Sequence, residues 1–392
     1  MKHTKLIGLA AIALCLLLYS VPAGAIQSFC PTDTNGDGFS DDPNVVCKHL
    51  GAGDGLTMMA DGYPQYVFGF TDVTGVPDNL VMSTAMLGAN SPGPTITLNQ
   101  GQGLYLTLSN YGMAMRPDLF DPHTVHWHGY PQAISYYDGV PDASIAINMG
   151  GSLTYFYLAN DPGTYIYHCH VEATEHIQMG MIANFYVHPS QDSQSFDDPT
   201  DAVTKNYTLF AYNDNDGTTG YDVEAAILLT DFDRDFHDAS MNVQPLGFAA
   251  MDGDYFLMNG RGYPDTTSTA DILNEMGYAS QNKSSLISVT QGQRVLLRVS
   301  NLSVGSFYTV ESLGIPMKVV GQDAQLLRGP TGQDLTYKTS SVTLGGGQTY
   351  DVLIDTAGVP TGTYHLFSRN LHALNNNEER RGGMMTEIVV NP

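Results

Sequence analysis

The sequence predicts an all-β protein with two sandwich domains. Short runs rich in Val, Ile, Tyr, Thr and Leu are separated by Gly, Pro, Asn and Asp, and no long segment shows the period of an amphipathic helix. This succession of short strands and turns is typical of β-sandwiches. An internal repeat sets the number of domains, because the residue patterns of 100–110 and 163–165 recur at 291–301 and 362–364.

The first 25 residues have the organisation of a secretory signal peptide. Lys2 and Lys5 precede an apolar run over 6–18, and the small residues 23–25 fit a cleavage site. We therefore expect a signal peptide over 1–25 and a periplasmic or secreted protein. The apolar run is short for a membrane span, and no other segment comes near the required length, so we expect no span in the mature chain.

Residues 26–58 are predicted to form an acidic extension stapled by a disulfide. Cysteines of an exported protein tend to pair. Cys30 and Cys47 are the natural partners, which leaves Cys169 available for a metal.

The segment between these two cysteines imitates a calcium-binding loop. Its oxygen donors have the spacing of such loops, with Gly38 at the sharp turn. The bidentate Glu that closes an EF-hand is missing, because Asn44 stands there, and the segment is more similar to the aspartate-rich calcium loops of thrombospondin type 3 repeats. The alternative is a solvated acidic turn without a metal. The candidate calcium ligands are Asp33, Asn35, Asp37, Phe39 and Asp41.

Residues 59–190 are predicted to form the metal-bearing domain, with its densest set of ligands around Cys169. Side chains alternate between the two faces of a strand. Cys169 should therefore point to one face, while His168 and His170 point together to the other. One strand would then serve two metal sites, with the backbone of the cysteine between them.

The partner ligands lie upstream and divide by the same alternation. His126 and His128 share one face, and His123 takes the other. A blue-copper site needs two imidazoles, a thiolate and a weak thioether. The predicted type 1 copper ligands are His123, Cys169, His176 and Met181. The predicted ligands of the second site are His126, His128, His168 and His170. Imidazole suits several metals, so zinc is an alternative to copper at the second site.

These motifs resemble the multicopper oxidase family, which includes laccases and shares the cupredoxin fold with copper nitrite reductases. The resemblance rests on HTVHWHG over 123–129, on YHCH followed by HIQMGM over 167–181, and on Asp-Gly-Val-Pro over 138–141. Five residues instead of the usual three separate HCH from His176. The resemblance implies cupredoxin-like Greek-key sandwiches, a type 1 copper in the first domain, and type 2/type 3 copper at the four histidines.

The second domain, predicted over 200–392 after a polar linker, lacks these ligands. The positions equivalent to the His-Cys-His run hold Phe367, Ser368 and Arg369, and the segment 307–321 contains no histidine. This domain resembles the metal-free second domain of three-domain laccases. His365 and His372 are out of register, which makes them bystanders or, less simply, donors to a neighbouring subunit.

The number of histidines predicts a homo-oligomer. The family's trinuclear copper cluster takes eight histidines from two copper-bearing domains, and this chain offers four. Two first domains facing each other would supply all eight, in the two-fold arrangement that is commonest among oligomers.

The strongly acidic composition restricts the partners. Removal of Lys2 and Lys5 with the signal peptide lowers the formal charge from −24 to −26. Such a surface argues against nucleic acid and anionic membranes as partners.

The function that this pattern favours is one-electron oxidation of a small-molecule or metal-ion reductant at type 1 copper, coupled to O₂ reduction at the four-histidine site. Phenols, Fe(II), Mn(II) and Cu(I) all remain candidates as reductant. Two alternatives stay open. One is a copper nitrite-reductase-like enzyme, in which His128 and His168 would be the ligands of the catalytic copper. The other is a non-catalytic type 1 copper protein that transfers electrons or binds copper.

Overall fold

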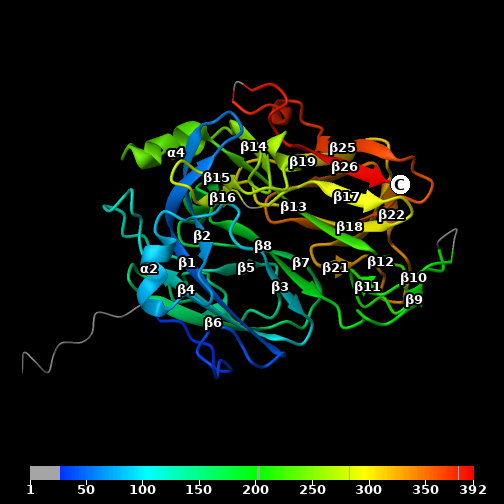
Figure 1. Ribbon diagram of the computed structural model, residues 1–392, viewed down its shortest axis with the longest axis horizontal. Coiled ribbons are helices and arrows are strands. Elements are labelled where there is room, and N and C mark those ends of the chain that lie inside the picture. The colour runs from blue at the N-terminus through cyan, green and yellow to red at the C-terminus, as the bar shows by residue number, and fades with distance from the viewer. Residues whose placement is uncertain (1–26, 201–203, 282, 378) are drawn as a thin grey trace, which may run out of the picture.

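Two β-sandwiches lie against each other in the computed structural model, which describes residues 27–200, 204–281, 283–377 and 379–392 (Figure 1). The all-β prediction is confirmed, and the sheets are those expected of cupredoxin domains. The predicted signal peptide lies outside the described residues.

The first sandwich consists of two four-stranded sheets. Their orders are β2-β1-β4-β6 and β3-β8-β7-β5. The strands of the first sheet are β1 (Val45–Met58), β2 (Pro64–Asp72), β4 (Gly103–Asn110) and β6 (Ser152–Leu158). The strands of the second sheet are β3 (Ile96–Asn99), β5 (His126–His128), β7 (Gly163–His168) and β8 (Ile182–His188). The buried faces of the two sheets form one apolar core that includes Trp127 and Cys169.

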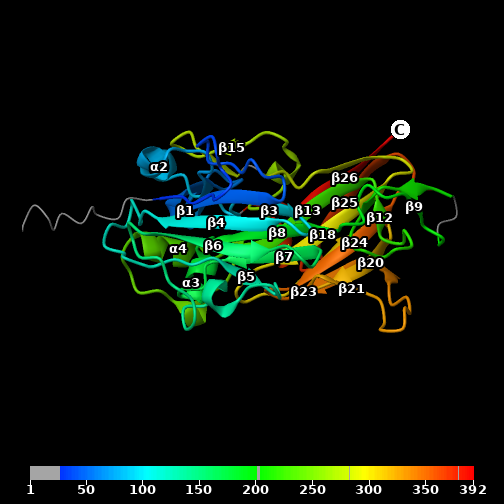
Figure 2. The same cartoon turned by 90° about the horizontal axis from the view of Figure 1, so that it is seen from below.

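The second sandwich repeats this plan with larger sheets. Its orders are β14-β13-β18-β24-β20-β21, with β22 also paired to β20, and β17-β26-β25-β19-β23. The first sheet contains β13 (Val223–Phe232), β14 (Tyr255–Met258), β18 (Arg294–Asn301), β20 (Met317–Gln322), β21 (Gln325–Leu326), β22 (Tyr337–Thr339) and β24 (Thr349–Asp355). The second contains β17 (Ile287–Thr290), β19 (Tyr308–Ser312), β23 (Ser341–Leu344), β25 (Gly362–Ser368) and β26 (Met385–Asn391). In the view of Figure 2, turned by 90°, strands of the first sandwich such as β1, β4 and β6 lie on the left, and strands of the second such as β24, β25 and β26 adjoin them on the right.

Short elements decorate the two sandwiches. Three two-stranded ribbons are formed by β9 (Phe196–Asp197) with β10 (Asn206–Tyr207), β11 (Leu209–Phe210) with β12 (Gly220–Tyr221), and β15 (Ile272–Leu273) with β16 (Ala279–Gln281). The α-helices are α2 (Asp78–Ala85), α3 (Ala173–Gln178) and α4 (Arg234–Met241). The 3₁₀ turns are Ser135–Tyr137, Phe248–Ala250, Asp265–Thr267 and His372–Leu374. No helix in the described parts of the chain is long and apolar enough to cross a membrane.

The sequence repeat corresponds to equivalent strands in the two sandwiches. In each, one sheet contains a parallel pair, β1 with β4 and β13 with β18, and the other contains a second parallel pair, β3 with β8 and β17 with β26. Asn110 and Asn301 end equivalent strands, and Gly163 and Gly362 begin equivalent strands. A Cβ atom on Gly163 would lie 2.7 Å from the side chain of Ala324, so this contact between the domains needs a glycine.

The predicted boundary between the extension and the first domain is wrong. Residues 45–58 form β1, which lies between β2 and β4 inside the sandwich. The sequence pattern did not predict this strand because Gly51 and Gly53 interrupt its run of strand-forming residues. A Cβ at either position would overlap the ring of Tyr111, which packs across the strand there. The predicted disulfide between Cys30 and Cys47 is confirmed, and it ties the shorter extension to β1.

A buried charged network holds the metal-bearing domain against the second domain. The fully buried guanidinium of Arg298 donates to Glu224 and, over 2.9 Å, to the hydroxyl of Thr164. Asp351 accepts hydrogen bonds from Thr164 and Tyr212. Because Thr164 belongs to β7, the strand that leads to Cys169 is anchored from the other domain.

Helix α4 of the second domain packs on β2 of the first. Asp233 caps its N-terminus by accepting from the backbone N–H of Phe236, over 2.9 Å. The buried ring of His237 places its nitrogens against the carbonyl oxygens of Tyr66 and Gln178. Gln178 is the last residue of α3, so α4 also supports the helix that carries His176.

Candidate metal centre

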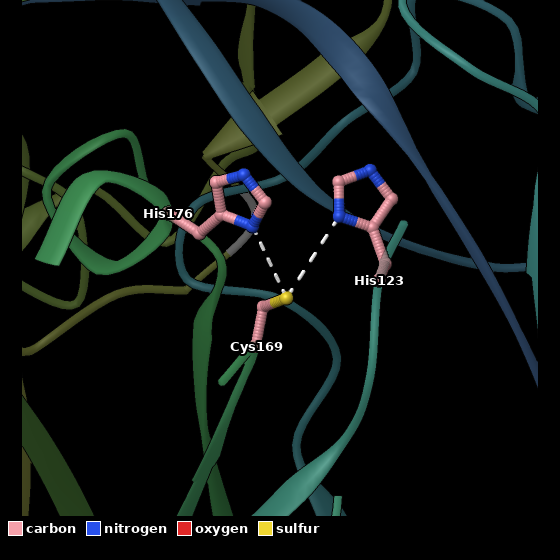
Figure 3. Close-up of side chains that lie close together, drawn as sticks. All are labelled: His123, Cys169 and His176. Atoms are coloured by element: carbon pink, nitrogen blue, oxygen red, sulfur yellow. Dashed lines mark hydrogen bonds between the residues drawn. The ribbon is translucent and has the colours of Figure 1, made fainter. Parts of the chain in front are cut away.

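Two buried imidazoles, those of His123 and His176, converge on the sulfur of the buried Cys169 (Figure 3). The Sγ atom lies 3.2 Å from Nδ1 of His176 and 3.8 Å from Nδ1 of His123. These three ligand atoms lie within 4.8 Å of one another, as a bound metal ion requires. Cys169 directly follows β7, His176 belongs to α3, and His123 lies in the loop before β5.

Backbone hydrogen bonds fix the positions of these ligands. The N–H of Cys169 donates to the carbonyl of Met181 over 3.2 Å, and the N–H of Met181 donates to that of His176 over 2.9 Å. His123 pairs with Ile147 through two bonds of 3.0 and 2.9 Å. The segment carrying Met181 is therefore held beside Cys169, and its side chain is fully buried in the same apolar core.

The electrostatics of this group favour a thiolate. Burial opposes ionisation of Cys169, but the neighbouring imidazoles of His176 and His123 outweigh it and hold the pKa of the thiol well below its usual range. The N–H of Thr124 points at Sγ over 3.5 Å. A buried thiolate with two imidazoles, and with the buried Met181 in the same apolar core, corresponds to the donor set of a blue-copper site, so the residues present fit copper.

The two additional residues before His176 are accommodated by the start of α3. Glu172 precedes this helix in the left-handed conformation, with φ 45° and ψ 49°. Its carboxylate comes close to that of Asp121 and to Nε2 of His176, all three ligand atoms lying within 4.8 Å of one another. The sequence interpretation missed this acidic pair. The signals were an acid two residues before His123 and an acid within the unusual spacer.

The four remaining predicted ligands form a second cluster. The ring centroid of His126 lies 4.9 Å from that of His170, 5.1 Å from that of His168 and 5.9 Å from that of His128. His168 lies 5.7 Å from His128 and 5.8 Å from His170. The strand alternation inferred from the sequence thus places all four imidazoles together, on the other side of Cys169.

Hydrogen bonds leave ring nitrogens of this cluster available to a metal. Nδ1 of His168 lies 2.8 Å from the carbonyl oxygen of Cys169, and Nδ1 of His126 lies 2.7 Å from that of Asp138. Donation by Nδ1–H fixes the tautomer in which Nε2 carries a lone pair. Burial lowers the pKa of His168 to about 3, and it also lowers those of His126 and His128. These lowered pKa values favour the neutral imidazole at His126, His128 and His168, the form that binds metals.

The second cluster opens into a cavity of about 410 Å³ between the two domains. The second domain contributes residues 302–307 and 346–347 to its wall. None of these carries an imidazole, thiol or carboxylate. Phe307 is 74% exposed, so this wall is open to solvent on one side. Among the described residues, the chain therefore supplies four histidines to the cavity and no further imidazole, thiol or carboxylate.

The described residues of the second domain form no equivalent centre. The register that pairs His126 with His168 in the first domain pairs Glu311 with Phe367 in the second. Among the described residues, neither His365 nor His372 belongs to a group of metal-ligand side chains. The ring of His372 instead packs on Phe256, at 5.1 Å between centroids.

The candidate calcium loop is closed by its own hydrogen bonds. Both carboxylate oxygens of Asp33 accept backbone N–H groups, from Gly36 at 2.6 Å and Gly38 at 2.8 Å. Asp41 accepts from the N–H of Thr34 at 2.8 Å, and this bonding with Thr34 lowers the pKa of the carboxyl. Calcium binding at this loop stays a prediction.

Comparisons with known proteins agree with this geometry. Family models described as "Multicopper oxidase" match residues 71–192 and 224–391. Laccase-1 of Cryptococcus neoformans is 26% identical over 305 residues, which cover 74% of this chain and 42% of that protein. Laccase-1 of Trametes villosa is 29% identical over 257 residues, which cover 63% of this chain and 40% of that protein. The chain thus spans about two fifths of the length of these relatives. The crystal structure of blue copper oxidase from Nitrosomonas europaea shares the fold, with a TM-score of 0.64 and 21% identity. The match covers 87% of this chain and 85% of that chain.

Proposed function

This chain belongs to the multicopper oxidase family, and from that premise we propose that it is a laccase-like copper-dependent oxidoreductase. Copper is the cofactor that this family and this donor set imply. In the proposed reaction, a reducing substrate gives up single electrons near Cys169, and O₂ is reduced beside the four histidines. The proposed type 1 ligands are His123, Cys169, His176 and Met181, and the proposed type 2/type 3 ligands are His126, His128, His168 and His170.

One observation carries the proposal: Cys169 connects the two clusters directly. Its sulfur belongs to the first cluster, and its carbonyl oxygen lies 2.8 Å from Nδ1 of His168 in the second. A few covalent bonds and one hydrogen bond therefore join the two sites. When bound, copper supplies reversible one-electron chemistry, while the protein fixes ligand geometry and charge. The buried core around Cys169 keeps water away from the thiolate.

We infer that a second subunit completes the four-histidine site. The cavity wall formed by the second domain offers no further ligand side chain, and the exposed Phe307 borders the same cavity. Two copies with their four-histidine cavities facing each other would bring eight imidazoles together. This arrangement is a homo-oligomer with a self-complementary interface.

Export and calcium binding are further parts of the proposal. The disulfide between Cys30 and Cys47 supports the export proposal, because disulfides persist in oxidising compartments such as the periplasm or the extracellular space. The loop over 33–41 would hold a structural Ca²⁺ next to this disulfide, far in sequence from the copper ligands.

Copper stoichiometry measured together with assembly mass tests the proposal. We expect more than one copper per chain, an oligomer, and O₂ uptake with a phenol or Fe²⁺. Replacement of His126 or His170 by Ala should remove the additional copper and the O₂ uptake but leave the blue absorption. A monomer that still reduces O₂ to water would contradict the shared site.

A non-catalytic type 1 copper protein is the second candidate, because the four-histidine site is incomplete within the chain. It would hold one copper per chain, show the blue absorption, and be inert towards O₂. Turnover of nitrite instead of O₂ would favour the nitrite-reductase-like alternative.

A further inference from the structure

The ligand positions of the candidate type 1 centre have structural equivalents in the second domain. His123 forms a β-bridge with Ile147, and Tyr308 pairs with Leu344 in the same antiparallel sense. In each domain a buried asparagine, the one that ends the equivalent strand, donates its side-chain N–H over 2.9 Å to the carbonyl of that partner, Ile147 or Leu344. Tyr308 therefore stands at the position of His123.

The equivalents of Cys169 and Met181 follow from a second pair of matching hydrogen bonds. The backbone N–H of Cys169 donates to the carbonyl of Met181 over 3.2 Å, and that of Ser368 donates to the carbonyl of Met384 over 3.0 Å. Cys169 directly follows β7, and Ser368 ends the equivalent strand β25. All four side chains are fully buried. Ser368 therefore stands at the position of the thiolate, and Met384 at that of the thioether.

The fourth position is that of the second imidazole. The backbone N–H of Met181 donates to the carbonyl of His176 over 2.9 Å, and that of Met384 donates to the carbonyl of Ala373 over 2.8 Å. Ala373, which is fully buried, therefore stands at the position of His176. The neighbouring His372 is out of register by one residue.

The side chains at these four positions do not fit copper as they stand. Tyr308, Ala373 and Met384 belong to one apolar core cluster, and Ser368 is buried with them. The hydroxyl of Tyr308 donates a hydrogen bond to the buried carboxylate of Asp231, which ties β19 to β13. Only the thioether of Met384 is a soft ligand of the kind that a type 1 centre uses. The second domain thus has the matching backbone and one of the four ligands.

We propose that the second domain holds a latent metal site, which the substitutions Tyr308→His, Ser368→Cys and Ala373→His together convert into a type 1 copper centre with Met384 as the weak ligand. Two imidazoles, a thiolate and a thioether are the donor set that selects copper, and the new thiol gives up its proton on binding. In the first domain the rings at the two histidine positions lie 5.0 Å apart between centroids. The smaller ring at position 308 therefore frees space beside position 373. This inference rests on the type 1 ligands proposed for the first domain and is independent of oxidase turnover.

The test uses the full chain with Cys169→Ser, which silences the centre of the first domain. In this background the three substitutions should restore an intense thiolate-to-copper absorption and raise the copper content by one per chain. The matched control is Tyr308→His/Ser368→Cys, which leaves the native His372 one residue out of register and should show no blue absorption. Copper at the four histidines is the same in all these proteins. Equal blue absorption in the control would overturn the assignment of position 373.

A second variant keeps the test decisive if the loss of the hydrogen bond between Tyr308 and Asp231 unfolds the domain. In the same background, Ser368→Cys/Ala373→His retains that bond. It should bind Co²⁺ with a thiolate charge-transfer absorption, which Ser368→Cys alone should lack.

The outcomes separate this inference from the proposed function. A triple variant that unfolds cooperatively in urea but holds no blue copper, or a second variant without the Co²⁺ absorption, would overturn the latent site while the wild type remained blue. A copper-loaded wild type without blue absorption would refute the type 1 ligands of the first domain, and with them both the proposed function and this inference.

Discussion

Thr124 contacts both candidate metal sites through different atoms. Its backbone N–H points at the sulfur of Cys169 over 3.5 Å, and its buried hydroxyl accepts from the backbone N–H of His170 over 3.1 Å. A hydrogen bond to the sulfur of a blue-copper cysteine is one of the factors that set its potential. Thr124, which is not a candidate ligand itself, therefore helps to fix the positions of the two sites relative to each other.

Replacement of Thr124 by Val should destabilise the protein. Val keeps the volume but leaves the N–H of His170 without its acceptor, which costs about 1–3 kcal/mol of unfolding free energy. Urea denaturation of the copper-free protein measures the loss. Thr124→Ser keeps the hydroxyl and should lose clearly less, so equal losses in the two variants would contradict the role of this hydrogen bond.

Replacement of Cys169 by Ser should abolish the blue absorption and any oxidase turnover. The hydroxyl of Ser does not ionise near neutral pH, so the thiolate that the two imidazoles favour is lost. Copper analysis and the visible spectrum measure the effect. Copper at the four histidines should be retained, and a variant that remained blue would show that Cys169 is not a ligand.

At the scale of elements, β7 is the strand that brings both clusters together, and it is anchored by charges from the other domain. Thr164 near its start joins the network of Arg298, Glu224 and Asp351, and Cys169 follows its last residue. Removing one partner of a buried charged network leaves another partner uncompensated.

The Arg298→Met variant should therefore be less stable by about 3–5 kcal/mol. The buried carboxylate of Asp351 would lose its cation, whereas Met would fill much of the same space. Chemical denaturation measures the change. The control is Lys48→Met, which breaks a partly exposed ion pair with Asp72 and should cost about 1 kcal/mol or less. Similar losses in both variants would show that the buried network does not hold the domains together.

The same network predicts a dependence of stability on pH. Burial opposes ionisation of Glu224, but the charge of Arg298 outweighs it and lowers the pKa of the carboxyl from 4.5 to about 2. Because the folded pKa is the lower one, the stabilisation is fully present above pH about 4.5 and is lost as the pH falls towards about 2. Unfolding free energies across this range should fall less steeply for Glu224→Gln than for the wild type. Parallel curves would contradict the prediction.

Strand alternation explains which features could be predicted from the sequence. The common face of His126, His128 and His168 follows from local strand geometry, and these three side chains do lie together. Strand β1 was missed because its glycines weaken the strand pattern, and their cause is the distant ring of Tyr111. The acidic pair was missed for a similar reason. The two carboxylates are separated by fifty residues of sequence, and they meet only through the conformation of the loop before α3.

At the scale of the whole molecule, the two sandwiches share a strand plan, and among the described residues the candidate copper ligands all lie in the first. The second sandwich closes one side of the four-histidine cavity without contributing a ligand side chain, and Phe307 stands exposed beside it. An exposed aromatic side chain at the edge of an incomplete site is a suitable position for contact with another copy.

The Phe307→Glu variant should weaken the assembly. A charge in the proposed interface opposes association, so sedimentation velocity should show a shift towards monomer, together with loss of the copper held by the four histidines. The blue absorption should persist, because its ligands lie within one chain. Leu273→Glu, at an exposed apolar residue of β15, is the control and should leave the assembly unchanged. An unchanged assembly in Phe307→Glu would place the interface elsewhere.

The contact between His237 and the carbonyls of Tyr66 and Gln178 has a consequence for electron transfer. It fixes the end of α3 to β2 through a side chain of the second domain, so the segment that carries His176 is braced from outside its own sandwich. In the proposed copper centre, a braced ligand segment would change shape less between the two oxidation states, which would lower the reorganisation energy of electron transfer. In the proposed function, the second domain would therefore contribute to the rigidity of the candidate centre.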